Sequence, residues 1–245
     1  MKITFLGTSH GLPQADRYCS SVLLEVGVNA YLIDGGAPIG DILTQKDFDF
    51  SRIKAIFTSH AHSDHTYGML QFISLCNWYY STVNMDIFFT EESLSEAYKN
   101  LELATTKRLD EERLRRKIVS EGEIFNDGVL KVTAVPTKHM QPYPSYSLVF
   151  DAEGKRFIYT GDLNYNGAFD FPKIAETEPS DLIITEAAHF AAEVTVEKTI
   201  SCPTKRVAVV HIGRDISSQI SIIEQANEKS DIVFSAPNDG DVIEI

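Results

Sequence analysis

Short apolar runs separated by polar turns fill the first quarter of the chain. These runs are rich in β-branched and aromatic residues, which favours strands at Lys2–Leu6, Ser21–Val26, Ala30–Ile33 and Ile53–Thr58. The last of them is continuously apolar, a pattern typical of a strand that is buried on both faces. Asp34-Gly35-Gly36 ends the third run, because this composition is typical of turns.

Apolar residues at helical spacing predict helices over Pro38–Lys46, His65–Tyr80, Glu91–Ser120 and Ser217–Lys229. The helix predicted over 91–120 has apolar positions at Leu94, Ala97, Tyr98, Leu101, Leu109, Leu114 and Ile118. It also carries the basic stretch 107–117, made up of Lys107, Arg108, Arg113, Arg115, Arg116 and Lys117. A solvated helix face is the simplest interpretation of this stretch, with a site for a substrate phosphate or a subunit partner as the alternative.

The second half of the chain returns to strands. We expect them at Val129–Val135, Tyr146–Phe150, Arg156–Thr160, Asp181–Thr185, Val207–Val210, Asp231–Ser235 and Asp241–Ile245. No Ser- or Gly-rich linker divides the sequence, which favours one domain over residues 1–245. Because strands and helices recur in both parts, we expect two similar halves. The predicted fold is α/β, a four-layer αββα sandwich with two facing sheets and helices outside.

Composition narrows the function classes. The chain has 245 residues and a net charge of −13, which argues against broad, non-specific binding of nucleic acid. It has no apolar run long enough to span a bilayer and no signal-peptide pattern, so a cytoplasmic protein without membrane contact is expected. Cys19, Cys76 and Cys202 form no CxxC pair and are expected to be structural thiols.

Residue types that bind metals are most concentrated in the run His60-Ala61-His62-Ser63-Asp64-His65. It sits where a buried strand is predicted to end and a helix to begin. In an extended segment, residues i and i+2 point the same way, so His60 and His62 can share one metal ion. As the chain turns into the helix, Asp64 and His65 can face a second ion. Imidazole and carboxylate suit zinc, manganese or iron.

Three further candidate ligands follow predicted strands in the second half. His139, Asp162 and His211 each come just after an apolar run, where loops carry function. A capping or strand-edge role is the alternative for each residue taken alone. Their succession after the first run favours one shared metal site.

His-x-His-x-Asp-His followed by His139, Asp162 and His211 resembles the signature of the metallo-β-lactamase superfamily. The resemblance implies that His60, His62 and His139 hold one metal, that Asp64, His65 and His211 hold the other, and that Asp162 bridges them. It further implies a hydroxide between the metals as nucleophile, oriented by Asp64. Two close cations suit that role, because they clamp the attacking and the leaving oxygen.

The N-terminal segment narrows the resemblance. Phe5-Leu6-Gly7-Thr8-Ser9-His10-Gly11-Leu12-Pro13 is similar to the opening of ribonuclease Z and of the cyclic phosphodiesterase of phosphonate breakdown. In this comparison Glu186 matches a ribonuclease Z glutamate whose histidine partner, in a His-Ser-Thr motif, is missing here. We therefore predict that His189 replaces that histidine as general acid, oriented by Glu186; a surface histidine is the alternative.

Only 22 residues separate His139 from Asp162, where ribonuclease Z has a long tRNA-binding arm. Together with the acidic composition, this argues against tRNA as a partner. His10, Lys138, Tyr143 and Tyr146 are weaker candidates for the pocket rim or its lining.

The favoured function is a phosphodiesterase with two divalent ions, zinc or manganese, acting on a small or cyclic phosphate ester. One alternative is a carbon-ester hydrolase, such as a lactonase or thioesterase, on the same site. Others are a non-catalytic metal-binding module and, if the ions are iron, a redox enzyme. A homodimer is left open.

Overall fold

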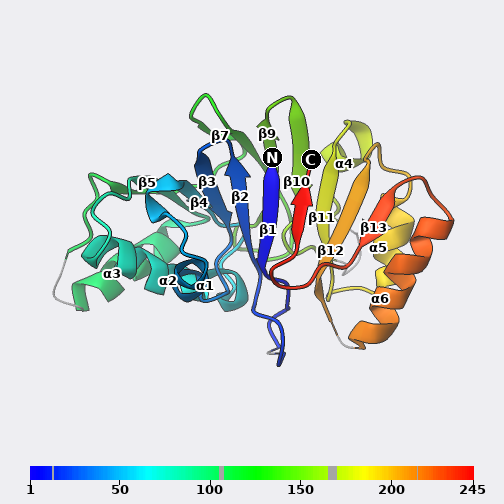
Figure 1. Cartoon of the computed structure of the whole chain (residues 1–245), viewed down its shortest axis with the longest axis horizontal. Coiled ribbons are helices and arrows are strands. Elements are labelled where there is room, and N and C mark those ends of the chain that lie inside the picture. Colours follow the sequence, from blue (N-terminus) through cyan, green and yellow to red (C-terminus); the bar gives the residue numbers. More distant parts are fainter. Residues whose placement is uncertain (13, 105–107, 165–169, 214) are drawn as a thin grey trace.

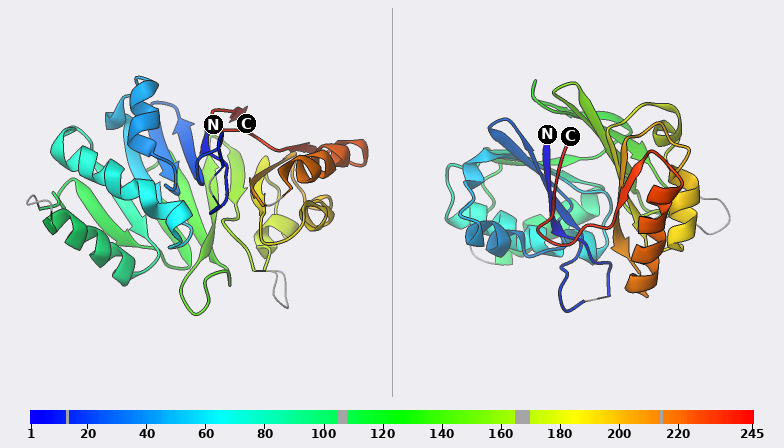
Figure 2. Two further views of the ribbon diagram at one scale, coloured as in Figure 1. Left: turned by 90° about the horizontal axis from the view of Figure 1, so that it is seen from below. Right: turned by 45° about the vertical axis from the view of Figure 1, so that its right-hand side comes forward.

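The computed structural model describes residues 1–12, 14–104, 108–164, 170–213 and 215–245, with the side chains of 100–104 left out. Two seven-stranded mixed sheets face each other, and the helices lie on their outer sides (Figures 1 and 2). This arrangement is the predicted four-layer αββα sandwich. None of the described helices is long and apolar enough to span a membrane.

The first sheet has the order β14-β1-β2-β3-β4-β5-β6. Its strands are β1 (Lys2–Gly7), β2 (Ser21–Val26), β3 (Asn29–Ile33), β4 (Ile53–Phe57), β5 (Met85–Phe89), β6 (Leu114–Ile118) and β14 (Val242–Glu244). Helices α1 (Ile39–Gln45), α2 (Ser63–Trp78) and α3 (Glu92–Ala104) lie outside it. A one-turn 3-10 helix, Phe50–Arg52, leads into β4.

The second sheet has the order β13-β12-β11-β10-β9-β8-β7. Its strands are β7 (Gly122–Asn126), β8 (Lys131–Pro136), β9 (Tyr146–Ala152), β10 (Lys155–Tyr159), β11 (Leu182–Ala187), β12 (Arg206–Ile212) and β13 (Val233–Ser235). Its outer side carries α4 (Lys173–Thr177), α5 (Ala192–Thr199) and α6 (Ile216–Gln225), with a 3-10 turn at Ala226–Glu228. The sequence patterns gave no prediction for β7, α4 or α5.

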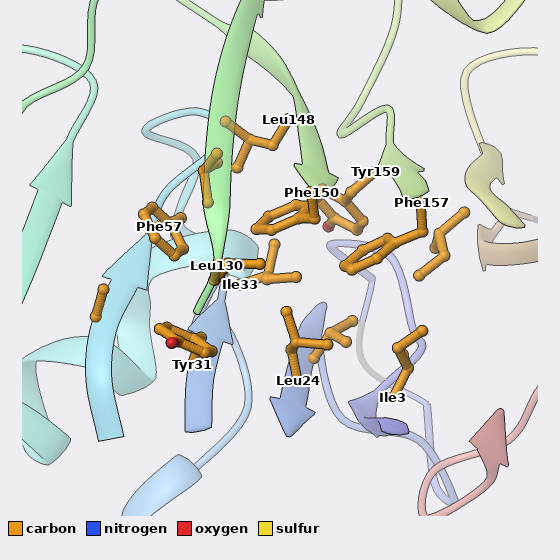
Figure 3. Close-up of a cluster of buried hydrophobic side chains, with 14 of the residues drawn as sticks. Ile3, Leu24, Tyr31, Ile33, Phe57, Leu130, Leu148, Phe150, Phe157 and Tyr159 are labelled. Atoms are coloured by element: carbon orange, nitrogen blue, oxygen red, sulfur yellow. The ribbon is translucent and has the colours of Figure 1, made fainter. Parts of the chain in front are cut away.

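Three apolar layers hold these elements together. The central layer joins the inner faces of both sheets, where the Phe57 ring packs edge-on against Phe150 and Phe150 stacks on Phe157 (Figure 3). The two outer layers join each sheet to its helices, as Phe72 of α2 and Ile223 of α6 illustrate. Burying an aromatic or aliphatic side chain of this size stabilises the fold by roughly 1.5–3 kcal/mol.

The predicted helix over 91–120 is wrong in its second part. After α3, Leu114–Ile118 forms the edge strand β6, parallel to β5, and Lys107 lies outside the described residues. Leu114 is fully buried next to Met85 in the strand register, and this tertiary pairing outweighs the helical spacing. Arg115 and Arg116 therefore lie on a strand and not on a helix face, and both make ion pairs with neighbouring carboxylates.

Two glycines allow the loop after β3 to lie against α2. A Cβ on Gly36 would come within 1.7 Å of the Asp64 carbonyl oxygen, and one on Gly68 within 1.7 Å of the Ala37 carbonyl oxygen. Only glycine permits this approach. The start of α2 is thereby held next to Asp34, which follows β3.

Candidate metal centre

The seven predicted ligands come together at one end of the sandwich. His60 follows β4, His139 follows β8 and Asp162 follows β10, while His211 lies near the end of β12. The α2 helix begins at the same end and carries Asp64 and His65 in its first turn, with His62 as its N-cap residue. The carboxyl ends of β4 in the first sheet and of β8, β10 and β12 in the second therefore meet at the site.

A first group of ligand atoms consists of three imidazoles and one carboxylate. The Nδ1 atom of His62 lies 3.1 Å from Nε2 of His60 and 3.1 Å from Nε2 of His139. Oδ2 of Asp162 lies 3.6 Å from Nε2 of His60 and 3.7 Å from Nε2 of His139. These four residues could hold one metal ion.

A second group shares Asp162 with the first. Oδ1 of Asp162 lies 3.3 Å from Nε2 of His65, and its Oδ2 lies 3.2 Å from Nε2 of His211. Oδ2 of Asp64 is 3.8 Å from both imidazole nitrogens. These four residues could hold a second ion, and Asp162 would belong to both groups.

The chemistry of the donors fits a divalent metal. Nε2 of His65 is buried and makes no hydrogen bond within the described part of the chain, although such a nitrogen normally has a partner. Zinc–nitrogen distances of about 2.0–2.1 Å place two nitrogens on one tetrahedral ion roughly 3.3 Å apart. The 3.1 Å separations around His62 are close to that value. An ion in each group would give these converging nitrogens a common partner.

Asp34 orients the second group, and the sequence patterns did not single it out as a site residue. It is fully buried, and its Oδ2 accepts hydrogen bonds from Nδ1 of His65 at 2.7 Å, from Ser59 at 2.7 Å and from the Tyr159 hydroxyl at 2.8 Å. The bond to Nδ1 directs Nε2 of His65 toward Asp162. The available signal was an aspartate directly after a buried strand, next to two glycines.

Ser59 extends the same arrangement to the first group. Its hydroxyl donates to Asp34 and therefore accepts from Nδ1 of His60, which lies 3.0 Å away. The Nε2 atom of His60 is then the one that faces His62 and Asp162. One buried carboxylate thus fixes ring orientations in both groups.

His211 is held in a strained backbone conformation. Its φ is +49°, and it is the extra residue of a β-bulge, since Glu186 pairs with Val210 while Ala187 pairs with Ile212. A non-glycine residue in this region costs about 1–3 kcal/mol and persists where its surroundings hold it. Nδ1 of His211 bonds the Ser20 hydroxyl at 2.9 Å, which points Nε2 toward Asp162. The bulge is what turns this side chain into the site.

Charges in the site are strongly coupled. Burial raises the pKa of Asp162, but the surrounding imidazoles of His211, His65 and His60 outweigh it and hold that pKa well below its usual value. Burial, reinforced by the neighbouring His65, lowers the pKa of His60 well below its usual value. Neutral His60 and ionised Asp162 are the protonation states that a metal requires.

Glu186 and His189 form a pair beside these groups. Nδ1 of His189 lies 2.8 Å from Oε1 of Glu186 and 4.0 Å from Oδ2 of Asp162. Glu186 is buried and also accepts from three backbone N–H groups, whereas the His189 side chain is 37% exposed. Burial lowers the pKa of His189, but the hydrogen bond and charge of Glu186 outweigh this and raise it. The pair presents an imidazole to solvent at the mouth of the site.

Of the weaker candidates for the pocket rim or its lining, only Tyr146 packs into the core. The His10 ring lies 6.1 Å from the His211 ring, and Tyr143 is 58% exposed. Lys138 is exposed next to His139. Tyr146 instead packs against the central core, and its hydroxyl bonds the Val119 carbonyl at 3.4 Å, which is a packing role.

Comparison with known proteins supplies a family and several neighbours. A family model described as anti-Pycsar protein Apyc1 matches residues 1–200, which include every predicted ligand except His211. A ribonuclease Z of Acaryochloris marina is 31% identical over 154 residues, which are 60% of this chain and 47% of that protein. The chain thus spans about half the length of the curated relatives it matches.

Solved structures share the fold over the whole chain. The metallo-β-lactamase fold protein YhfI from Bacillus subtilis superposes with a TM-score of 0.79 at 17% identity, covering 100% of this chain and 98% of that one. The short form of human tRNase Z has a TM-score of 0.75 at 19% identity, with 100% and 99% covered. A diphosphatase of the PhnP family has a TM-score of 0.71 at 16% identity, with 100% and 97% covered.

These comparisons contradict the prediction against tRNA as a partner. The similar curated proteins are named ribonuclease Z, and one of the structural neighbours is the short form of human tRNase Z. The prediction relied on a missing insertion and on net charge. Neither excludes RNA, because a local surface can bind phosphates on an acidic protein.

Proposed function

Because this chain belongs to the Apyc1 family and is a metallo-β-lactamase-superfamily hydrolase related to ribonuclease Z, we propose that it is a phosphodiesterase with two divalent ions. Its substrate would be a small or cyclic phosphate ester. The observation that carries the proposal is Asp162, a buried carboxylate common to two groups of ligand atoms. The residues proposed as ligands are His60, His62, His139, Asp64, His65, His211 and Asp162.

The chemistry follows from this shared carboxylate. When bound, a pair of divalent ions activates water at neutral pH and offsets charge on a phosphate. Asp162 would keep the two sites close together, and Asp64 would orient the nucleophile. The nitrogen and oxygen donors suit zinc or manganese, and iron is a further candidate.

His189 is our candidate for the general acid. Hydrolysis of a phosphodiester breaks the P–O bond to a leaving alkoxide. This bond breaks more easily when a general acid donates a proton to the leaving oxygen. His189 faces solvent 4.0 Å from Asp162, and its hydrogen bond to Glu186 raises its pKa, which favours the protonated form. Glu186 is the positioning residue, because its backbone hydrogen bonds fix the carboxylate beneath the imidazole.

A precursor tRNA is the second candidate substrate. It is favoured by the relatives named ribonuclease Z, which match 60% of this chain. The small-ester proposal is supported instead by the short connection between His139 and Asp162, in which β9 and β10 form a hairpin.

The test compares rates on bis(p-nitrophenyl) phosphate, a 3′,5′-cyclic nucleotide, a precursor tRNA and a lactone, with bound metal identified in the same sample. Hydrolysis of the cyclic nucleotide by protein that holds about two ions per chain supports the proposal. Preference for the tRNA would replace the substrate class but keep the metal centre. Preference for the lactone, or metal binding without any hydrolysis, would refute the phosphodiesterase.

A further inference from the structure

Thr8 connects the second metal group to the C-terminal turn, which we define as residues 237–240. Thr8 is fully buried, and its carbonyl accepts the backbone N–H of His211 at 2.8 Å. Its hydroxyl donates to Oδ1 of Asp239 at 2.7 Å and accepts from Nη1 of Arg17 at 3.1 Å. The backbone position of His211 therefore depends on a residue that is itself tied to the C-terminal turn.

The C-terminal turn is bound firmly to the loop after β1. Arg17, which is 9% exposed, donates to the Pro237 carbonyl at 3.2 Å and to Oδ1 of Asn238 at 2.7 Å. Oδ2 of Asp239 accepts the Tyr18 N–H at 2.6 Å. Both carboxylate oxygens of Asp239 are thus used inside the protein, and neither contacts a proposed ligand.

Ser20 contacts the ring of His211. Its hydroxyl lies 2.9 Å from Nδ1 of His211, and it stands two residues after Tyr18. Ser9, next to Thr8, forms isolated β-bridges to Ile212 and to Cys19. The backbone of His211 is therefore held by Thr8 and its ring by Ser20, while the C-terminal turn binds Thr8, Arg17 and Tyr18.

We infer that Asp239 is a positioning residue for the second metal group: through Thr8 it fixes the left-handed backbone of His211 and so sets the affinity of that group alone. Among the described residues, no hydrogen bond runs from this network to His60, His62 or His139, which belong to the first group alone and come from other loops. The inference rests on the proposed metal centre.

The experiment titrates Zn²⁺ into metal-stripped full-length protein by calorimetry, with a chromogenic chelator as competitor. The variants are Asp239→Asn, Thr8→Val and Thr8→Ser, and the exposed Asp231→Asn is the matched control. His211→Ala and His62→Ala identify which binding phase belongs to which group. We expect Asp239→Asn and Thr8→Val to weaken the phase lost in His211→Ala by about 10-fold or more and the other phase by less than about twofold. Thr8→Ser, which keeps the hydroxyl, should restore wild-type binding.

Wild-type affinities in both phases for Asp239→Asn and Thr8→Val would overturn the inference and leave the metal centre intact. Equal weakening of both phases would also overturn it, because that marks a general structural defect. A wild-type protein without Zn²⁺ binding would overturn the metal centre and the inference together. If Asp239→Asn does not fold, the comparison of Thr8→Val with Thr8→Ser decides the question.

Discussion

The two ends of the sandwich differ in how their charged side chains are paired. At the end where the parallel strands begin, here called the opposite end, cations and carboxylates neutralise each other. Glu25 accepts from Lys2 at 2.8 Å and from Arg52 at 2.9 Å, and Asp181 accepts from Lys205 at 2.6 Å. Each of these charged groups has a partner of opposite charge within the protein and needs no ligand.

At the site end, where the same strands end, the described polar groups are not all paired in this way. Imidazole nitrogens face one another across 3.1 Å, and Nε2 of His65 has no hydrogen bond among the described residues. The β-bulge at His211 adds backbone strain. Sites that bind a cation often keep such unfavourable arrangements, since the ion compensates them. The comparison therefore separates residues that stabilise the fold from residues that we propose as metal ligands.

The strongest test of this contrast is Asp162→Asn. Removing the shared charge should empty both metal groups and lower phosphodiester hydrolysis by about a thousandfold or more, because metal catalysis contributes several kcal/mol. Metal content by mass spectrometry and the rate on bis(p-nitrophenyl) phosphate measure both effects. Asp181→Asn, a matched change at the opposite end, should leave metal content and rate unchanged. Two retained ions in Asp162→Asn would contradict a shared ligand.

A second effect should appear without metal loss. His189→Ala is expected to lower turnover of a cyclic phosphate ester about 100-fold, the ordinary contribution of a general acid. The loss should be smaller on bis(p-nitrophenyl) phosphate, whose leaving group needs no proton. Turnover that is unchanged across the pH range, with both ions bound, would refute the role of His189.

The pH profile sharpens the same assignment. Activity that requires protonated His189 falls as pH rises through its pKa. Glu186 raises that pKa, so Glu186→Gln should lower it and move the alkaline limb of kcat/KM to lower pH. An alkaline limb that does not move would show that the titrating group is not His189.

Asp34→Asn probes how the site end is pre-organised. Asparagine tolerates the φ of +53° at this position, but it cannot serve His65, Ser59 and Tyr159 as a carboxylate does. We expect metal affinity to fall about 10–100-fold. Competition with a chelator measures it, and the exposed Asp41→Asn on α1 is the control. An unchanged affinity would show that the ring of His65 is held by packing alone.

Period-two and helical patterns predicted most of the fold and failed where tertiary contacts decide. Ser21–Val26 was predicted to the residue, because Val22, Leu24 and Val26 alternate along one buried face. Leu114–Ile118 was assigned to a helix, since its pairing with β5 depends on residues almost 30 positions earlier in the chain. Short elements such as α4 carry too few apolar residues for a periodic signal.

The site could be predicted in part for the same reason. Histidines and aspartates after strands are visible in sequence, and the structure brings all seven together. Residues that act through hydrogen bonds are not visible in this way. Asp34, Thr8 and Ser20 look like ordinary loop residues until folding places them behind His65 and His211.

The smallest expected effect belongs to the opposite end. Burial raises the pKa of Glu25, but Lys2 and Arg52 outweigh it and lower the pKa, so the ionised carboxylate stabilises the fold. Glu25→Gln should cost about 0.2–1 kcal/mol at neutral pH, as is usual for pairs near the surface. A lowered folded-state pKa gives stability that is present above the unfolded-state pKa and lost as pH falls through the folded-state value. The difference between wild type and variant in urea unfolding should therefore vanish in acid, while metal content stays unchanged at neutral pH. A change in metal affinity would instead mean that the two ends are coupled through the strands that join them.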